Sequence, residues 1–431
     1  MTKHIIKVAE MFAGVGGFHL GLKRASSDYK VVWANQYEPE RKKQFAYEIY
    51  RNRFPDTYIS NVDISKVEKS KIPDINLVVG GFPCQDYSVM STAAKGLYGK
   101  KGVLWWDIKD VIEEKWPQFL FLENVDRLLK SPGVAKEQPG RDFGMILKTL
   151  SELGYSVQWK MINAADYGFP QRRRRTFIFA AREDTHFSEH LRTAIMLNKN
   201  QLIRYIATMA PLSSSLPVKE LGEIQTIDLS KYGTLAEFSK RFKVKYGFRQ
   251  TGIMSAGKVF MADYAAKSTE SVKLRSIVKS NLSDQSQFLS DEQKSRFSIL
   301  KAGFRAVKTS RTGFEYKYGM GGIDYPDSLD KPARTMVTSE HTISRTTHVI
   351  IDPGNGRERL LTPEEAEQIN TFPEGWTKLA GVTDSERFFT MGNALVVNLV
   401  RDIAIEIDKI AEGEDDFTRY RGNRRVQNIE H

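Results

Sequence analysis

The feature that most constrains the fold is a series of short apolar runs within the first 185 residues. The runs are IIKVAEMF, VVWANQYEP, INLVVGGFPC, PQFLFLENV and RTFIFAAR, and most of them end on glycine or polar residues. A helical segment, HLGLKRASS, follows the first run after a glycine turn. Such alternation is typical of a parallel sheet covered by helices on both faces, whose ligands bind beyond the carboxyl ends of the strands. We therefore predict an α/β fold with its site at that edge.

The pattern changes near residue 186. Lysine-rich and serine-rich stretches such as SKRFKVKYGFRQ follow without clear periodicity, and order returns near residue 346. There TPEEAEQINTF predicts a helix with Thr362 as N-cap and Glu365 completing a capping box. The later run FTMGNALVVNLVRDIAIEIDKIAE predicts one long amphipathic helix. We expect a main domain at 1–185, a smaller and irregular domain at 186–345, and a segment at 346–431 that returns to complete the first.

The positive charge of the chain is concentrated in the middle range. The 431 residues carry a formal net charge of +11, and 25 Lys and Arg against 15 Asp and Glu lie between His186 and Arg345, a difference of +10. An acidic partner would suit this excess, and nucleic acid is the commonest one. No apolar run approaches the roughly 20 residues of a membrane helix, and the start lacks the apolar core of a signal peptide. We expect an intracellular protein that needs no membrane.

The turn FAGVGGF after the first strand brings the backbone close to any ligand there, because its glycines lack a Cβ. A dinucleotide fingerprint would need a third glycine at His19, so the spacing better suits a cofactor without a pyrophosphate. A turn that merely joins strand to helix is the alternative. Polar groups that could bond a ribose and an adenine follow the next two strands and favour the cofactor: Gln36, Glu38 and Asp63.

The single cysteine, Cys84, lies in GGFPCQDYS. One cysteine excludes an internal disulfide and a cysteine-rich zinc site, so we expect no metal and a reducing compartment. A lone cysteine is usually a small buried apolar residue. This one follows the apolar run and is flanked by polar residues, where a thiol would project into a cleft. Its pKa would need lowering by positive charge, which the arginines of PQRRRRTF could supply.

A carboxylate and a run of arginines complete the candidate chemistry. Glu123 ends the strand FLFLEN, where it is either a helix cap, a solvated group or a functional acid. The run Arg172 to Arg175 opens a strand, whose alternation sends Arg173 and Arg175 to one face and their two neighbours to the other. A solvated basic edge is the simpler reading. We expect one face to line the cleft and the other to meet phosphate or solvent.

Taken in order, FAGVGGF, NVDI, GGFPCQ, ENV, QRRRR and MGN resemble the motif series of the DNA cytosine-5 methyltransferases. The similarity covers about the first 180 and the last 80 residues. It implies a Rossmann-like S-adenosylmethionine-dependent catalytic and cofactor-binding domain at 1–185, a target recognition domain at 186–345, and a C-terminal segment that completes the catalytic domain.

The resemblance also implies roles for the candidate residues. In that family the cysteine attacks carbon 6 of cytosine, the glutamate bonds or protonates N3, and the resulting enamine attacks the sulfonium methyl; here these residues are Cys84 and Glu123. Arg175 would hold the cytosine O2 and Arg173 would support the site. The target base must leave the duplex to reach them, so base flipping is implied.

The cofactor implied is S-adenosylmethionine. The resemblance assigns Phe12 to stacking near the adenine, the turn from Ala13 and Gly14 through Gly16 and Gly17 to the methionine end, and Asp63 and Ile64 to the adenine. It assigns Pro83, Leu104 and Asn393 to the pocket walls. Where the family usually has glutamate then tryptophan, this chain has Gln36 and Tyr37, followed by Glu38. Tyr37 can stack, and the ribose contact is open between Gln36 and Glu38.

The partner implied is double-stranded DNA, read by the basic middle range. We expect the reading loops in KTSRTGFEYKYGMGGI and ARTMVTSEHTISR, and a closing loop in STAAKGLYGKKG. A bacterial, cytoplasmic and nucleoid-associated monomer is expected, with a separately acting restriction endonuclease as a possible companion. Two alternatives remain: an RNA (tRNA) cytosine-5 methyltransferase of the same fold, and an inactive DNA-binding homologue.

Overall fold

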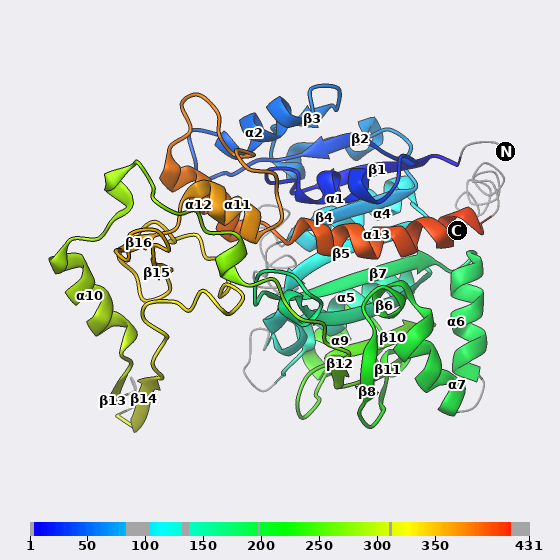
Figure 1. The fold of residues 1–431 in the computed structure, drawn as a ribbon. Coiled ribbons are helices and arrows are strands. Elements are labelled where there is room, and N and C mark those ends of the chain that lie inside the picture. The colour runs from blue at the N-terminus through cyan, green and yellow to red at the C-terminus, as the bar shows by residue number, and fades with distance from the viewer. Residues whose placement is uncertain (1–3, 83–103, 132–137, 197–198, 310–312, 415–431) are drawn as a thin grey trace.

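The computed structural model describes residues 4–82, 104–131, 138–196, 199–309 and 313–414 (Figure 1). Pro83 and Cys84, which the sequence assigns to the cofactor pocket and to nucleophilic attack, lie outside these ranges, as does the predicted closing loop.

A ten-stranded sheet forms the centre of a large body. Its strands lie in the order β3-β2-β1-β4-β5-β7-β6-β10-β11-β9. In chain order they are β1 (Ile6–Met11), β2 (Tyr29–Asn35), β3 (Ile59–Ser60), β4 (Leu77–Gly81), β5 (Phe119–Val125), β6 (Tyr155–Asn163), β7 (Arg174–Arg182), β9 (Gln225–Asp228), β10 (Thr251–Ser255) and β11 (Lys258–Ala262). All five predicted apolar runs form strands of this sheet.

Only half of the sheet has the predicted parallel pairing. Strands β3, β2, β1, β4 and β5 are parallel to their neighbours, whereas β7 runs antiparallel to β5 and β6 antiparallel to β7. Residues 164–173 join β6 to β7, and a connection this short cannot make the crossover that parallel pairing needs. The expectation of a wholly parallel sheet was therefore wrong beyond β5.

Helices cover both faces of the sheet, as predicted. One buried apolar cluster includes residues of α1 (Gly17–Ala25), α2 (Phe45–Arg53), α6 (His186–Met196), α11 (Pro363–Ile369) and α13 (Val397–Glu412). A second cluster includes residues of α4 (Leu104–Lys115), α5 (Arg141–Glu152) and α9 (Leu235–Arg241). Strands β4 and β5 send alternate side chains to the two clusters, for example Val79 to the first and Val78 to the second.

The sheet continues past residue 185. Strands β9, β10 and β11 come from the middle range and extend the sheet from β6, and α7 (Lys199–Arg204) and α8 (Pro211–Ser214) also belong to the large body (Figure 1). Two further strands, β8 (Val218–Leu221) and β12 (Tyr264–Ala266), pair beside it. These strands belong to the large sheet because β10 is buried along its whole length and pairs with β6, which lies nearly 100 residues earlier in the sequence. As a division between functions, the boundaries at 185 and 345 stay a prediction.

A smaller lobe projects from one side of the body (Figure 1). It contains α10 (Asp291–Lys301) and two antiparallel pairs, β13 (Phe304–Thr309) with β14 (Glu315–Met320) and β15 (Val349–Ile351) with β16 (Glu358–Leu360). The β13–β14 hairpin lies at the free end of this lobe (Figure 1).

Two helices occupy the range where one long helix was predicted. Helix α12 (Asp384–Asn393) ends before the extended residues Ala394 and Val396, and α13 then begins at Val397. Val397 N donates to Asn370 O instead of to a helical partner, which stabilises the break. By length and composition alone, Asp384–Glu412 could cross a membrane; in the structure the apolar face of α13 packs on α1. The predicted capping box of Thr362 and Glu365 at α11 is confirmed.

Candidate active site

The glycine turn between β1 and α1 has an open space beside it. Gly14 and Gly16 have positive φ angles of 54° and 84°, and a Cβ at Gly14 would meet no atom within 4 Å. Phe12, at φ 55°, is a non-glycine residue in the same left-handed region. Such strain persists only where the surroundings impose it, and it is common at ligand sites. The open space and the left-handed backbone agree with the predicted ligand site at this turn, which stays a prediction.

Side chains from the neighbouring strand hold this turn. Gly14 N donates to Gln36 Oε1 at 2.8 Å, and Gln36 is buried. Asn35 Nδ2 donates to Val62 O at 2.9 Å, which joins the end of β2 to the segment before Asp63. Tyr37 is 38% exposed and Glu38 is half-buried beside Arg41, with burial raising the pKa of Glu38 against the opposing effect of Arg41.

Glu10 is a carboxyl group under the turn that sequence reasoning did not select. It is fully buried in β1, accepts from Tyr50 Oη at 3.0 Å and from His19 N at 3.3 Å, and burial raises its pKa to about 8. His19 stacks on Phe54 and lies in hydrogen-bond contact with the same tyrosine. The available signal was an acidic residue inside an otherwise apolar strand, which is costly unless it has hydrogen-bond partners.

The remaining described cofactor candidates lie around the same edge. Asp63 caps a short 3-10 helix by accepting from Ser65 N, and Ile64 is buried. Lys69 Nζ donates to Ile64 O and pairs with Asp107 of α4, the helix that Leu104 begins. Asn393 is exposed at the end of α12, two residues before Leu395, whose side chain lies against Gly17. That these residues together form a cofactor pocket stays a prediction.

Glu123 and Arg175 form the ion pair of the candidate catalytic centre. Arg175 Nε lies 2.8 Å from Glu123 Oε1, and both side chains are mostly buried, at 17% and 13% exposed. The pair forms because the ends of β5 and the start of β7 are antiparallel neighbours, with Val125 opposite Arg175. A Cβ at Gly81 would lie 2.9 Å from Glu123 Oε2, so the carboxylate also lies beside the end of β4.

Asn124 connects this carboxylate strand to the segment that leads to Cys84. Its Nδ2 donates to Phe82 O at 2.7 Å in a buried bond, and its Oδ1 accepts from Val125 N. Sequence reasoning treated the ENV motif as a whole and did not give this residue a role. The bond fixes the last described residue before the cysteine segment relative to Glu123.

Arg173 is buried among carbonyl oxygens. Its guanidinium donates to Met336 O at 3.0 Å and to Gly392 O at 2.9 Å, and the side chain is fully enclosed. Burial, with Arg175 nearby, lowers its pKa, and Glu123 opposes that shift. The predicted alternation of the run is confirmed, because Arg172 and Arg174 are exposed whereas Arg173 and Arg175 turn inward.

The segment Ala333–Met336 attaches the small lobe to this arginine run. Ala333 exchanges two backbone hydrogen bonds with the run, at Pro170 and Arg172, and Met336 N donates to Gln171 Oε1 at 3.1 Å. The first four residues of the predicted reading loop ARTMVTSEHTISR thus connect lobe and body. Its role as a reading loop stays a prediction.

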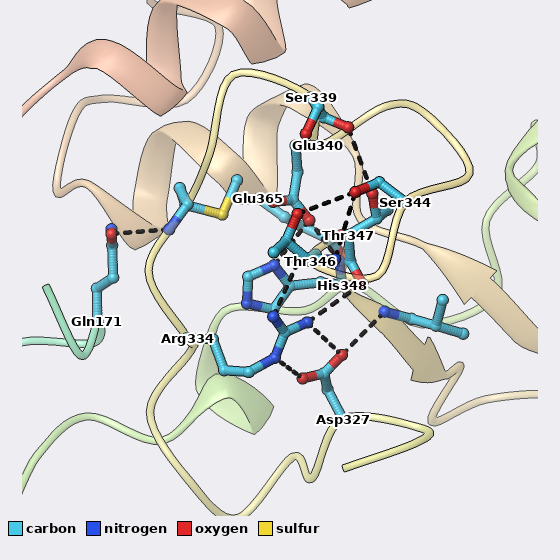
Figure 2. A network of polar contacts seen from close by, with 12 residues as sticks. Gln171, Asp327, Arg334, Ser339, Glu340, Ser344, Thr346, Thr347, His348 and Glu365 are labelled. Carbon is cyan, nitrogen blue, oxygen red and sulfur yellow. Dashed lines mark hydrogen bonds and ion pairs between the residues drawn. The ribbon is translucent and has the colours of Figure 1, made fainter. Parts of the chain in front are cut away.

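A polar network holds the other side of that segment (Figure 2). Arg334 forms a double contact with Asp327, and Lys301 at the end of α10 pairs with the same carboxylate at 3.1 Å. Burial alone would raise the pKa of Asp327, but the bonds from Arg334 and the charges of His348, Arg334 and Lys301 lower it to about 2. His348 Nδ1 lies 2.7 Å from Glu340 Oε1 in the same network. Ion pairs and hydrogen bonds therefore stabilise the small lobe where it joins the large body.

Comparison with known proteins gives one family for nearly the whole chain. Residues 6–409 match the family model described as C-5 cytosine-specific DNA methylase. The Type II methyltransferase M.Sau3AI of Staphylococcus aureus is 41% identical over 424 residues, which cover 96% of this chain and 99% of that protein. The Type II methyltransferase M.HhaI of Haemophilus parahaemolyticus is 33% identical over 179 residues, which cover 42% of this chain and 50% of that one.

Solved structures support the fold. The chain resembles a Spodoptera frugiperda DNMT2 mutant with a TM-score of 0.57 at 14% identity, covering 94% of this chain and 99% of that one. It resembles the S. pombe Dnmt2 methyltransferase with a TM-score of 0.56 at 13% identity. Both likenesses agree with a Rossmann-like methyltransferase architecture.

Proposed function

The chain belongs to the C-5 cytosine-specific DNA methylase family and is a DNA cytosine-5 methyltransferase related to restriction-modification enzymes, and we propose that it acts through a covalent adduct of Cys84. The observation that carries this mechanism is the ion pair of Glu123 and Arg175 beside Gly81. Three residues further along the sequence stands the only thiol of the chain.

In the proposed reaction the Cys84 thiolate adds to carbon 6 of a flipped cytosine while Glu123 bonds or protonates N3. Carbon 5 thereby becomes nucleophilic and takes the methyl group. Loss of the carbon-5 proton then expels the thiolate and restores the aromatic ring, so the enzyme is regenerated. Arg175 bonds the cytosine O2, and its contact with Glu123 keeps both groups pointed toward one ring edge.

The positive charge of Arg173 would support a thiolate at Cys84, because a nearby cation lowers the pKa of a thiol, whereas the charge of Arg175 is balanced by Glu123. Arg173 has carbonyl acceptors in its contacts with Met336 and Gly392, so those bonds do not neutralise its charge. The same contacts make it a positioning residue for the cleft.

The methyl donor is proposed to be S-adenosylmethionine, which supplies an electrophilic methyl on a sulfonium. The open space beside Gly14 suits its methionine end, and the exposed ring of Tyr37 suits stacking on the adenine. Phe12, Asp63, Ile64, Leu104 and Asn393 would complete the pocket. For the ribose we propose Gln36, because its side chain already lies against the turn.

The affinity for the cofactor shows whether Gln36 or Glu38 binds the ribose. We expect Gln36→Ala to weaken binding of S-adenosylmethionine more than Glu38→Ala, measured by isothermal titration, because Glu38 lies beside Arg41 and outside the turn. The reverse order would assign the ribose to Glu38.

Double-stranded DNA is the proposed bound substrate, with the small lobe and its β13–β14 hairpin reading the sequence. We also propose that the enzyme acts as a monomer in the bacterial cytoplasm, on nucleoid DNA, and alongside a separate cognate endonuclease.

Replacing Cys84 tests the mechanism. We expect Cys84→Ser to abolish methyl transfer from labelled cofactor while keeping cofactor affinity, since the hydroxyl is a far weaker nucleophile at neutral pH. Undiminished turnover would refute the covalent step. A duplex with 5-fluorocytosine should trap the unaltered protein covalently; a folded protein that forms no adduct would instead support an inactive DNA-binding role, and transfer to tRNA alone would support the RNA alternative.

A further inference from the structure

A cluster of cations on the large body lies outside the small lobe. The segment Lys240–Arg249, here called the lysine segment, begins with the last two residues of α9 and precedes β10 in the sheet. Beside it lies the short 3-10 helix Asp126–Lys130, which begins directly after β5. Sequence patterning groups the lysine segment with the irregular middle range, but the structure attaches it to the catalytic body (Figure 1).

Aromatic side chains fix the lysine segment in place. Phe242 and Phe248 are buried and stack with ring centroids 5.9 Å apart, and Phe143 of α5 packs edge-on against Phe248 at 5.0 Å. Phe242 O also accepts from Gln138 Nε2 at 2.8 Å. The segment is therefore a preformed surface, which loses little conformational freedom when a ligand binds.

The lysine segment touches the chain just beyond the catalytic carboxylate. Phe248 N donates to Leu129 O at 2.9 Å, and Leu129 is six residues after Glu123. Gly247 has φ 74°, and a Cβ there would lie 2.7 Å from the same Leu129 O. Only glycine allows so close an approach in this conformation. The lysine segment thus lies at the carboxyl edge of the sheet, where β5 delivers Glu123.

The side chains that this surface presents are cationic and unpaired. Within the described residues none of the following forms a salt bridge, and all are exposed: Arg127, Lys130, Lys240, Arg241, Lys243 and Lys245. The ranges 126–130 and 235–249 hold seven Lys and Arg against two acidic residues, Asp126 and Glu237. Tyr246, 55% exposed, lies between them with Lys245 over its ring.

We propose that the lysine segment, with Arg127 and Lys130, binds the phosphate backbone of the DNA whose cytosine enters the active site. This inference rests on the proposed function. It adds a second DNA-binding surface, on the large body, to the one proposed for the small lobe. Phosphate is the ligand of choice because the cations are exposed ammonium and guanidinium groups on one edge. Such contacts hold any sequence equally and fix the duplex while one base is rotated out.

Salt dependence of DNA binding tests the proposal. We expect the variant Lys243→Gln/Lys245→Gln to bind sheared genomic DNA more weakly, and to lower the slope of log affinity against log salt by about 2, since each lost phosphate contact removes about 1. The sites methylated in genomic DNA, read by bisulfite sequencing, should not change. Methyl transfer should recover at low salt.

The matched control is Lys7→Gln/Lys30→Gln. These two exposed lysines are register partners at the start of β1 and β2, the edge of the sheet opposite the site. The control removes the same charge and should keep the wild-type slope. Equal slopes for both variants would overturn the proposal, as would a lysine surface that binds an acidic protein without affecting DNA. If the unaltered protein transfers no methyl group to any DNA, the proposed function fails instead, whatever the slopes.

Discussion

Two buried arginines, Arg173 of the large body and Arg359 of the small lobe, have opposite surroundings. In the lobe, Arg359 is enclosed by the carboxylates of Asp352 and Glu365, and Arg334 by that of Asp327. In the body, Arg173 is equally buried but donates to the carbonyl oxygens of Met336 and Gly392. Arg359 and Arg334 are thus paired with carboxylates in place, whereas the hydrogen bonds of the Arg173 guanidinium within the described residues run to uncharged oxygens. The lobe pairs serve structure, and we assign the body charge to chemistry.

The largest expected effect is on stability, in the lobe. Arg334→Met removes the main partner of a buried carboxylate, which typically costs about 3 to 5 kcal/mol. Denaturant unfolding followed by circular dichroism measures it. The double variant Arg334→Met/Asp327→Asn should recover only part of the loss, because the buried carboxylate is then neutral but the buried Lys301 loses its partner. A single variant as stable as the parent would remove the contrast between the two regions.

A smaller effect is expected on activity, in the body. Arg173→Lys keeps the charge but cannot reach both carbonyl oxygens, so single-turnover methyl transfer should fall about 100-fold, or about 2.7 kcal/mol, while unfolding changes less than in the lobe variant. The control is Arg172→Lys, at an exposed position in the same run. Equal rates for the two variants would show that Arg173 has no special part in positioning.

The smallest effect concerns a buried acid of the body, Glu10. Its pKa is raised by burial to about 8, so the native state holds a proton that the unfolded chain releases near 4.5. Its stabilising contribution is full below pH 4.5 and is lost as the pH rises toward 8, by at most about 1.4 kcal/mol per pH unit. Glu10→Gln should flatten this decline between pH 6 and 7 in thermal unfolding. An unchanged slope would mean that Glu10 is ionised in the folded protein.

The part of the fold that local patterns specify was predictable. Apolar runs ending on glycine located β1, β4 and β5, and the capping signal at Thr362 located α11. The inward turn of Arg173 and Arg175 followed from strand alternation alone. These features depend on a residue and its near neighbours, which is the information that a single sequence carries.

Features that depend on distant partners were not predictable. Strand β10 has no apolar–polar alternation because both of its faces are buried, and only its pairing with β6 identifies it. The break between α12 and α13 depends on Asn370, which accepts from Val397 across more than 25 residues. The helix pattern through Ala394 is continuous in sequence. Likewise, Asn124 has a role only through its bond to Phe82.

The packing of α13 on α1 has a consequence for truncated chains. Arg24 donates to Thr371 O and to Asn398 Oδ1, both at 2.7 Å, and Trp376 Nε1 donates to Val15 O at 2.8 Å beside the glycine turn. The first helix and the glycine turn are therefore held by residues that lie 347 and 361 positions later in the sequence. In a chain without these later residues, the first helix would lose the contacts that support it. Removing the range 371–414 would therefore leave the first helix and the glycine turn without these contacts.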